Sequence, residues 1–165
     1  DKKKARKSFG CNNINEKWVL FTSIQTDNPI KRLFLAKDSI AKANKKLGNI
    51  KLRVASDIPR SKMPLFISSC DMILCTSENE GWPNSIKEAL ACNIPFVSTD
   101  VSDLKYISDN ESTCRICPPD SDIIAENICD VLVKKEKVDL RGYAKEFSSD
   151  KINTKLINLY KNLVN

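Results

Sequence analysis

Two glutamates, Glu80 and Glu88, stand on either side of a short segment that contains Gly81 and Pro83. Glycine and proline favour a sharp turn here, and the residues after Pro83 have the composition of a helix. In a continuous helix the two carboxylates would lie about 12 Å apart along the axis. A turn at Gly81 changes that distance, so both side chains can face one pocket above the helix start.

The start of this helix, formed by the backbone of Trp82, Pro83, Asn84 and Ser85, has the properties of an anion site. The first N–H groups of a helix have no intrahelical partner, and the helix dipole places positive charge there. A carboxylate beside a bound diphosphate needs another role, and accepting hydrogen bonds from two hydroxyl groups is the suitable one. Two polyols joined by a diphosphate, as in a nucleoside diphosphate sugar, therefore fit this arrangement.

Glu88 also has a purely structural interpretation. Ser85 and Glu88 have the spacing of a capping box, in which both side chains bond to backbone N–H groups at the helix start. An apolar run follows directly, which is typical of a helix start. On spacing alone Glu88 is a capping residue and Glu80 an ordinary loop carboxylate, so a ligand is one interpretation of two.

Strand-like and helix-like segments alternate along the chain. Apolar and β-branched runs predict strands at residues 17–23, 50–56, 72–76, 94–99 and 113–117. Apolar residues at helical spacing predict helices at residues 30–47, 62–70, 85–92, 101–108, 120–135 and 140–164. The alternation predicts one domain over residues 1–165, with a Rossmann-like, doubly wound parallel sheet, helices on both faces and three αβα layers. Ligands of such sheets bind beyond the carboxyl ends of the strands, where the loop with Glu80 falls.

Composition excludes several functions. The 165 residues contain no histidine, so this chain alone cannot build a Ser-His-Asp or Cys-His nucleophile. The net charge of +6 comes without a platform of basic and aromatic residues, so nucleic acid is not an expected partner. No apolar run is long enough to span a membrane. The chain begins with Asp1, and we interpret it as a piece of a longer protein.

A basic run occupies the amino terminus, where five of the first seven residues are lysine or arginine. This run is either a patch for phosphate or an anionic membrane, or a solvated, frayed terminus. Because chain termini are commonly disordered, we expect the frayed terminus.

The seven cysteines are an odd number scattered through apolar stretches, which is typical of free, buried thiols in a reducing cytoplasm. Cys114 and Cys117 have the spacing of a metal or redox pair. They lack a second pair, and in a strand residues three apart point to opposite faces. We therefore expect no metal site.

The segment from Glu80 to Asp100 resembles the signature of the retaining family 4 glycosyltransferases, whose motif is two glutamates separated by seven residues. The likeness continues through Ala89-Leu90-Ala91-Cys92 and the strand that begins at Pro95. It covers residues 5–135 and includes Lys31. A paired-glutamate spacing alone would be weak, but the flanking strands make it specific.

The resemblance implies the C-terminal, donor-binding domain of an enzyme with two Rossmann-like domains. In this resemblance Glu80 matches the glutamate that contacts sugar hydroxyls near the reacting carbon. Glu88 matches the glutamate that holds the ribose hydroxyls, and Lys31 matches the lysine that neutralises the diphosphate. The main chain of Ile58 meets the base. The implied catalytic residues are Glu80 and Lys31, and the implied donor-binding residues are Ser23, Lys31, Ile58, Gly81, Trp82, Pro83, Asn84, Ser85 and Glu88.

Two features depart from the family pattern. Family members commonly carry a glycine and an arginine after the first strand, whereas Ser23, Ile24, Gln25 and Thr26 stand here. Either Arg32 or a different geometry compensates for the missing arginine, or the diphosphate binds more weakly. The acceptor domain, with its usual histidine, is absent from this sequence, so the isolated domain is expected to bind donor but to transfer sugar poorly.

The resemblance thus predicts transfer of a sugar, with retention, from a nucleoside diphosphate donor to a glycan or lipid-linked acceptor in polysaccharide biosynthesis. No metal or cofactor is expected to be required. The alternatives are a nucleotide-sugar epimerase of the same architecture and a non-catalytic nucleotide-binding or interaction module. The expected location is the cytoplasm, with peripheral association at the inner membrane face as a further option.

Overall fold

The computed structural model describes residues 2–11, 13, 15–23, 25, 27–134 and 139–164. Within these residues, five parallel strands form one sheet in the order β2-β1-β3-β4-β5. Their bounds are β1 (Lys17–Thr22), β2 (Ile50–Ala55), β3 (Met72–Cys75), β4 (Phe96–Thr99) and β5 (Arg115–Cys117). The order reverses between β1 and β3. The predicted Rossmann-like, parallel α/β class is confirmed.

Helices connect the strands, close to the predicted ranges. Their bounds are α1 (Lys2–Ser8), α2 (Leu33–Leu47), α3 (Met63–Ser69), α4 (Asn84–Ala91), α5 (Leu104–Asn110), α6 (Ser121–Val133), α7 (Arg141–Lys145) and α8 (Ser149–Val164). Two short 3-10 turns, η1 (Pro29–Lys31) and η2 (Arg60–Lys62), precede α2 and α3. Asp120 caps α6, since its side chain accepts from the N–H groups of Asp122 and Ile123. The last residue of the predicted helix 120–135 lies outside the described residues.

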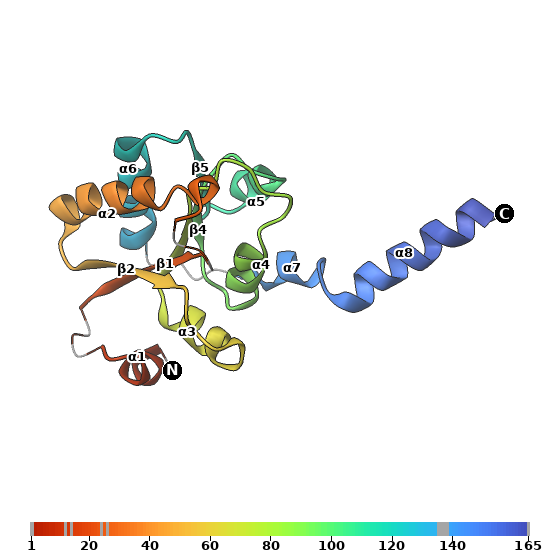
Figure 1. The fold of residues 1–165 in the computed structure, drawn as a ribbon, viewed down its shortest axis with the longest axis horizontal. Coiled ribbons are helices and arrows are strands. Elements are labelled where there is room, and N and C mark those ends of the chain that lie inside the picture. The colour runs from red at the N-terminus through yellow and green to blue at the C-terminus, as the bar shows by residue number, and fades with distance from the viewer. Residues whose placement is uncertain are drawn as a thin grey trace.

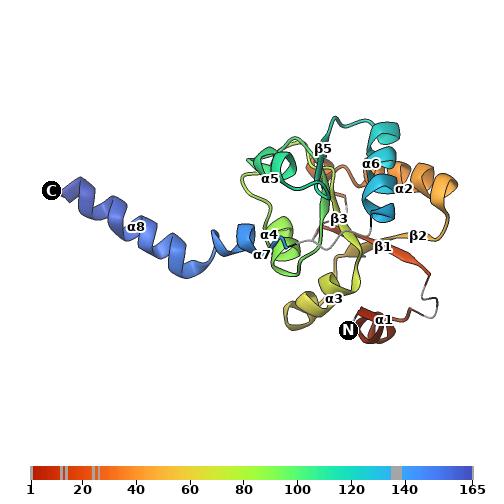
Figure 2. The ribbon, with the colours of Figure 1, turned by 180° about the vertical axis from the view of Figure 1, so that it is seen from behind.

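The sheet is covered on both faces (Figures 1 and 2). Trp18 and Leu20 of β1 belong to the apolar cluster formed with α3, α4 and α5. Val19 and Phe21 belong to the second cluster, formed with α2 and α6. Because successive strand residues point to opposite faces, a strand buried on both sides must be apolar throughout. This is why β3 and β4 are fully buried.

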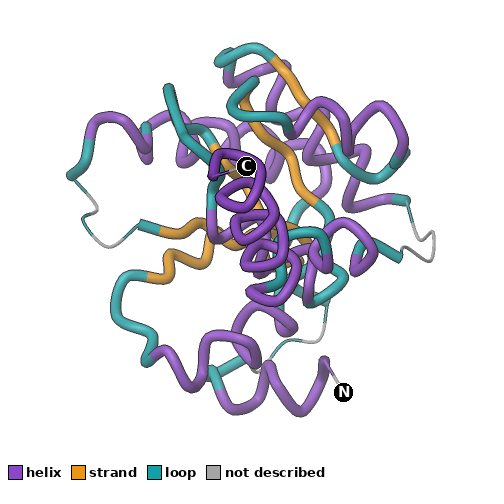
Figure 3. The backbone as a smooth tube through the Cα atoms, turned by 90° about the vertical axis from the view of Figure 1, so that its right-hand side faces the viewer, coloured by secondary structure: helices purple, strands orange, loops and turns teal. Residues whose placement is uncertain are grey.

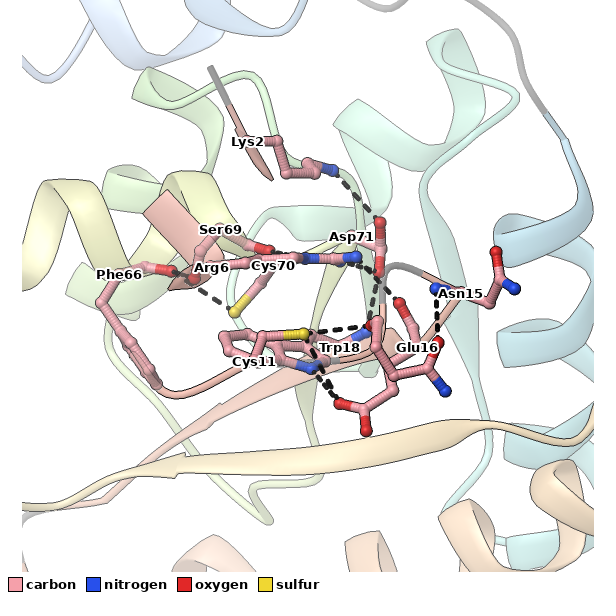
Figure 4. Close-up of polar contacts among 11 residues, drawn as sticks. Lys2, Arg6, Cys11, Asn15, Glu16, Trp18, Phe66, Ser69, Cys70 and Asp71 are labelled. Carbon is pink, nitrogen blue, oxygen red and sulfur yellow. Dashed lines mark hydrogen bonds and ion pairs between the residues drawn. The ribbon is translucent and has the colours of Figure 1, made fainter. Parts of the chain in front are cut away.

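The amino-terminal basic run is ordered, so the expectation of a frayed terminus is wrong. It forms α1, in which Arg6 is only 6% exposed. The Arg6 guanidinium donates to Asp71 Oδ2 at 2.5 Å and to the carbonyls of Ser69 and Glu16 at 2.8 Å each (Figure 4). A buried arginine with three acceptors fixes the helix, while the lysines of α1 stay exposed.

Asp71 and Glu16 extend this network at the amino ends of β1 and β3 (Figure 4). Asp71 also accepts from the Trp18 N–H at 2.7 Å and from Lys2 Nζ at 3.2 Å. Glu16 accepts from Lys51 at 2.6 Å and from the Trp18 indole at 2.9 Å. These hydrogen bonds, Lys51 first, hold the pKa of Glu16 below its ordinary value of 4.5. The network lies at the sheet edge opposite Glu80.

The carboxyl-terminal helix α8 is confirmed, but its apolar side chains are exposed. Figures 1 and 2 show α8 extending away from the sheet, and Figure 3 looks along it from its end. The exposed apolar residues include Ile152, Leu156, Leu159, Tyr160 and Leu163. In the part of the chain that the structure describes, no helix has both the length and the apolar character needed to cross a membrane.

The seven cysteines are free thiols, as predicted. Cys114 and Cys117 are buried, and burial raises the pKa of both thiols to about 11. A thiol with so high a pKa is a poor nucleophile and a poor metal ligand at neutral pH. Over the described ranges no three His, Cys, Asp or Glu side chains gather into a potential metal site.

Candidate functional site

A cavity of about 640 Å³ lies beyond the carboxyl ends of β1 and β2, beside the loop after β3. This is the reversal point of the strand order, where doubly wound sheets bind ligands. Every residue singled out from the sequence lines the cavity except Ile58: Ser23, Lys31, Glu80, Gly81, Trp82, Pro83, Asn84, Ser85 and Glu88. Ile58 instead packs, partly buried, against the apolar cluster under α3 and α4. Its proposed main-chain role stays a prediction.

Five further residues line the cavity without having been singled out from the sequence: Thr22, Gln25, Asn28, Ala55 and Met63. The first four belong to the ends of β1 and β2 or to the loop after β1. The rule that ligands bind beyond the carboxyl ends of the strands could therefore have found them. Met63 is different. It belongs to α3, and no sequence pattern indicates that this helix start reaches the cavity.

Lys31 is positioned by a break in the helix predicted for residues 30–47. The chain forms η1, passes through Arg32 in the left-handed region (φ 50°), and only then begins α2. The Thr76 hydroxyl donates to the carbonyls of Lys31 at 2.8 Å and Arg32 at 3.0 Å, and the Glu78 N–H donates to the Ile30 carbonyl at 2.8 Å. These bonds tie the turn to the loop after β3 and offset the cost of the unusual backbone.

Lys31 and Glu80 meet inside the cavity. Lys31 Nζ lies 2.5 Å from Glu80 Oε1, and the Ser77 hydroxyl donates to the same oxygen at 2.8 Å. Both side chains of the pair are partly buried. With Oε1 held by two donors, Oε2 is oriented and available to hydroxyl groups of a ligand.

Replacing Thr76 by valine removes the donor that holds this turn. We expect the free energy of unfolding to fall by about 1–2 kcal/mol. Valine has nearly the same shape as threonine, but it leaves the two carbonyls without their buried hydrogen-bond donor. Urea denaturation followed by circular dichroism measures this. The control is Thr154→Val on exposed α8, where the hydroxyl bonds only to the Asp150 carbonyl within its own helix. Equal, small effects of the two substitutions would contradict the role of Thr76.

The helix start at the cavity is uncapped. Helix α4 begins at Asn84, its N-cap is Pro83, and no side chain of the described residues bonds to its first N–H groups. Ile86 N donates to the Pro83 carbonyl at 3.1 Å, whereas Asn84 and Ser85 precede any possible intrahelical acceptor. No acidic residue occupies the first turn. The N–H groups and the positive dipole end are therefore free for an anion.

The capping box predicted for Ser85 and Glu88 is wrong. Pro83 has an extended backbone, so the helix begins earlier than predicted and both residues lie inside it. Glu88 is exposed, lines the cavity, and its carboxylate makes no hydrogen bond or ion pair within the described residues. This carboxylate is thus free to accept hydroxyl groups.

Nothing replaces the family arginine in the described part of the segment after β1. Ser23 is buried and its hydroxyl donates to the Gln25 carbonyl at 2.5 Å, while residues 24 and 26 lie outside the described residues. Arg32 does not substitute, since it pairs with Glu78 at 3.2 Å and is not part of the cavity wall. Among the lining residues that the structure describes, Lys31 is the one cation.

With this geometry in place, the sequence matches the family Glycosyl transferases group 1 over residues 35–134, which is more than half of the chain. The chain belongs to the group 1 glycosyltransferases. The match begins after Lys31 and includes both glutamates of the cavity. A comparison with curated proteins gives no match.

Several solved structures share the fold of this glycosyltransferase chain at low sequence identity. Anabaena HepE, solved with UDP and glucose, has a TM-score of 0.74 and 17% identity over 97% of this chain and 51% of its own. S. aureus TarM, solved with UDP and sugar ligands, has 0.71 and 19% over 88% and 35%. The pneumococcal O-GlcNAc transferase GtfA, solved with UDP and GlcNAc, has 0.67 and 15% over 92% and 37%. The chain thus spans about a third to a half of these proteins.

Proposed function

We propose that this chain is the donor-binding half of a retaining glycosyltransferase, which moves a sugar from a nucleoside diphosphate to a hydroxyl group of a glycan or lipid-linked acceptor. The observation that carries the proposal is the uncapped start of α4, flanked in one cavity by two carboxylates and one lysine. A diphosphate fits the helix start, and the polyols on either side fit Glu80 and Glu88.

The proposed chemistry uses charge stabilisation. The bond between the anomeric carbon and the diphosphate oxygen breaks, and its electron pair leaves with the nucleoside diphosphate. Lys31 and the N–H groups of α4 stabilise the charge that develops there. The acceptor oxygen forms the new bond to the anomeric carbon on the face that the diphosphate leaves, and its proton passes to the released diphosphate or to solvent. None of these steps requires a metal ion.

The other half of the site is proposed to lie in a second domain. The similar structures are about two to three times as long as the matched region, which supports a further domain for the acceptor. This chain has no histidine, so an imidazole base would have to come from that domain. We therefore expect the chain alone to bind donor and to transfer sugar poorly.

Replacing Glu88 by alanine tests the donor site. We expect the affinity for the matching nucleotide sugar to fall about tenfold, because a charge-assisted hydrogen-bond acceptor for hydroxyl groups is lost. Isothermal titration calorimetry of the chain with UDP-glucose, GDP-mannose and ADP-glucose measures it. The matched control is Glu126→Ala on α6, an exposed carboxylate that is not part of the cavity wall.

Two results would count against the proposal. If none of the three nucleotide sugars binds, the chain is not a donor domain. If Glu88→Ala and Glu126→Ala bind equally well, the nucleotide occupies another site. Nucleotide binding together with persistent inactivity, after the acceptor domain is supplied, would favour the non-catalytic module.

A further inference from the structure

A second cavity, of about 560 Å³, adjoins the cavity lined by Lys31, Glu80 and Glu88, which is called the donor cavity below. The second cavity has no role in the proposed donor site. It lies between the loop before α4, helix α5, and the corner where α7 meets α8. Trp82 lines both cavities. A ligand in the second cavity would therefore sit next to the bound donor.

Aromatic side chains are four of the nine residues that line this cavity. Trp82 packs against Phe147 with ring centroids 4.1 Å apart and ring planes tilted by 49°, and Tyr106 meets Tyr143 edge to face at 6.3 Å. Tyr106 is 67% exposed, so its ring is accessible to a ligand. A pyranose ring has an apolar face of C–H groups that packs against such a ring, and the amphipathic character of tyrosine suits a ligand with hydroxyl groups at its rim.

Carboxylates stand at the edge of the same cavity. Asp103, just before α5, is exposed and its carboxylate makes no hydrogen bond or ion pair within the described residues. Glu146, in the corner between α7 and α8, pairs with Lys151. A purely apolar ligand such as an acyl chain would desolvate these charges without supplying donors, which costs free energy. A sugar supplies hydroxyl donors to them.

We propose that this cavity binds a pyranose unit of the acceptor glycan, with Tyr106 stacking on the sugar face and Asp103 accepting its hydroxyl groups. The inference rests on the proposed function and adds the acceptor class: a saccharide that contacts the donor domain itself. The packed pair of Trp82 and Phe147 forms the wall between the two sugars. Lys87 Nζ lies 5.4 Å and 5.3 Å from the centroids of these two rings and supports that wall.

Saturation-transfer NMR on the chain tests the proposal. The probes are the methyl glycosides of glucose, galactose, mannose and N-acetylglucosamine, maltotriose and chitotriose, with octanoate as the apolar probe. UDP is present at saturation, and its own signal reports the donor site. We expect transfer to the ring protons of at least one sugar, reduced at least about fivefold by Tyr106→Ala and by Asp103→Asn. The control, Tyr160→Ala on exposed α8, leaves the transfer unchanged.

The outcomes separate the two ideas. If UDP binds but no sugar responds, or if a sugar responds equally in Tyr106→Ala and wild type, the acceptor subsite is wrong and the donor function stands. A response of octanoate alone also overturns the subsite. If UDP and all nucleotide sugars fail to bind, the proposed function fails, and the subsite fails with it. Tyr106 and Asp103 are exposed, so their variants are expected to fold.

Discussion

We expect replacement of Lys31 by alanine to lower kcat for the proposed sugar transfer by about 100- to 1,000-fold, the usual cost of removing one group that stabilises a developing negative charge. Lys31 is the one cation among the described residues of the donor cavity, and the other charged groups there are Glu80 and Glu88. Without the ammonium, the departing diphosphate faces two carboxylates and keeps only the N–H groups of α4. The effect on the reaction is therefore large.

The measurement is steady-state transfer of labelled sugar by the chain together with the proposed acceptor domain. Lys31→Arg keeps the charge but changes its geometry, so it recovers part of the lost rate. Lys45→Ala, on the exposed surface of α2, is the control and keeps the full rate. If Lys31→Ala changes kcat less than about threefold while Glu88→Ala weakens donor binding, the diphosphate is stabilised elsewhere and the assignment of Lys31 is wrong.

The sequence was sufficient for those parts of the fold that depend on local pattern. Apolar strands alternating with helices predicted the parallel sheet. Because ligands bind beyond the carboxyl ends of such strands, the loop with Glu80 after β3 was predicted to lie at the ligand-binding end of the sheet. Gly81 and Pro83 in that loop predicted its turn. Each of these signals lies within a few residues of the feature it predicts, so no knowledge of distant contacts was needed.

Features that depend on distant contacts could not be predicted. The break at Arg32 depends on the hydroxyl of Thr76, 44 residues away, which no periodicity in residues 30–47 indicates. The order of α1 depends on the pairing of Arg6 with Asp71, 65 residues away. The capping box failed for a local reason, since Pro83 began the helix early and left Glu88 facing the cavity. Without the capping box, Glu88 has no structural role at the helix start, which favours its interpretation as a ligand-binding residue.

Replacing Asp71 by alanine lowers the free energy of unfolding by about 2–4 kcal/mol, because it leaves the buried guanidinium of Arg6 without its charged partner. It also removes the acceptor of the Trp18 N–H at the start of β1. Urea denaturation measures the loss. Arg6→Ala has a similar effect, and the double substitution costs clearly less than the sum of the two, since both remove the same pair.

The matched control is Lys2→Ala, which breaks the other ion pair of Asp71 at its exposed side. That pair is largely solvated, so we expect a loss below about 1 kcal/mol. The network lies at the amino ends of the strands and the donor cavity at their carboxyl ends, so donor affinity stays unchanged in the folded variants. If Asp71→Ala costs no more than Lys2→Ala, or if the effects of Asp71→Ala and Arg6→Ala simply add, α1 is held by packing alone.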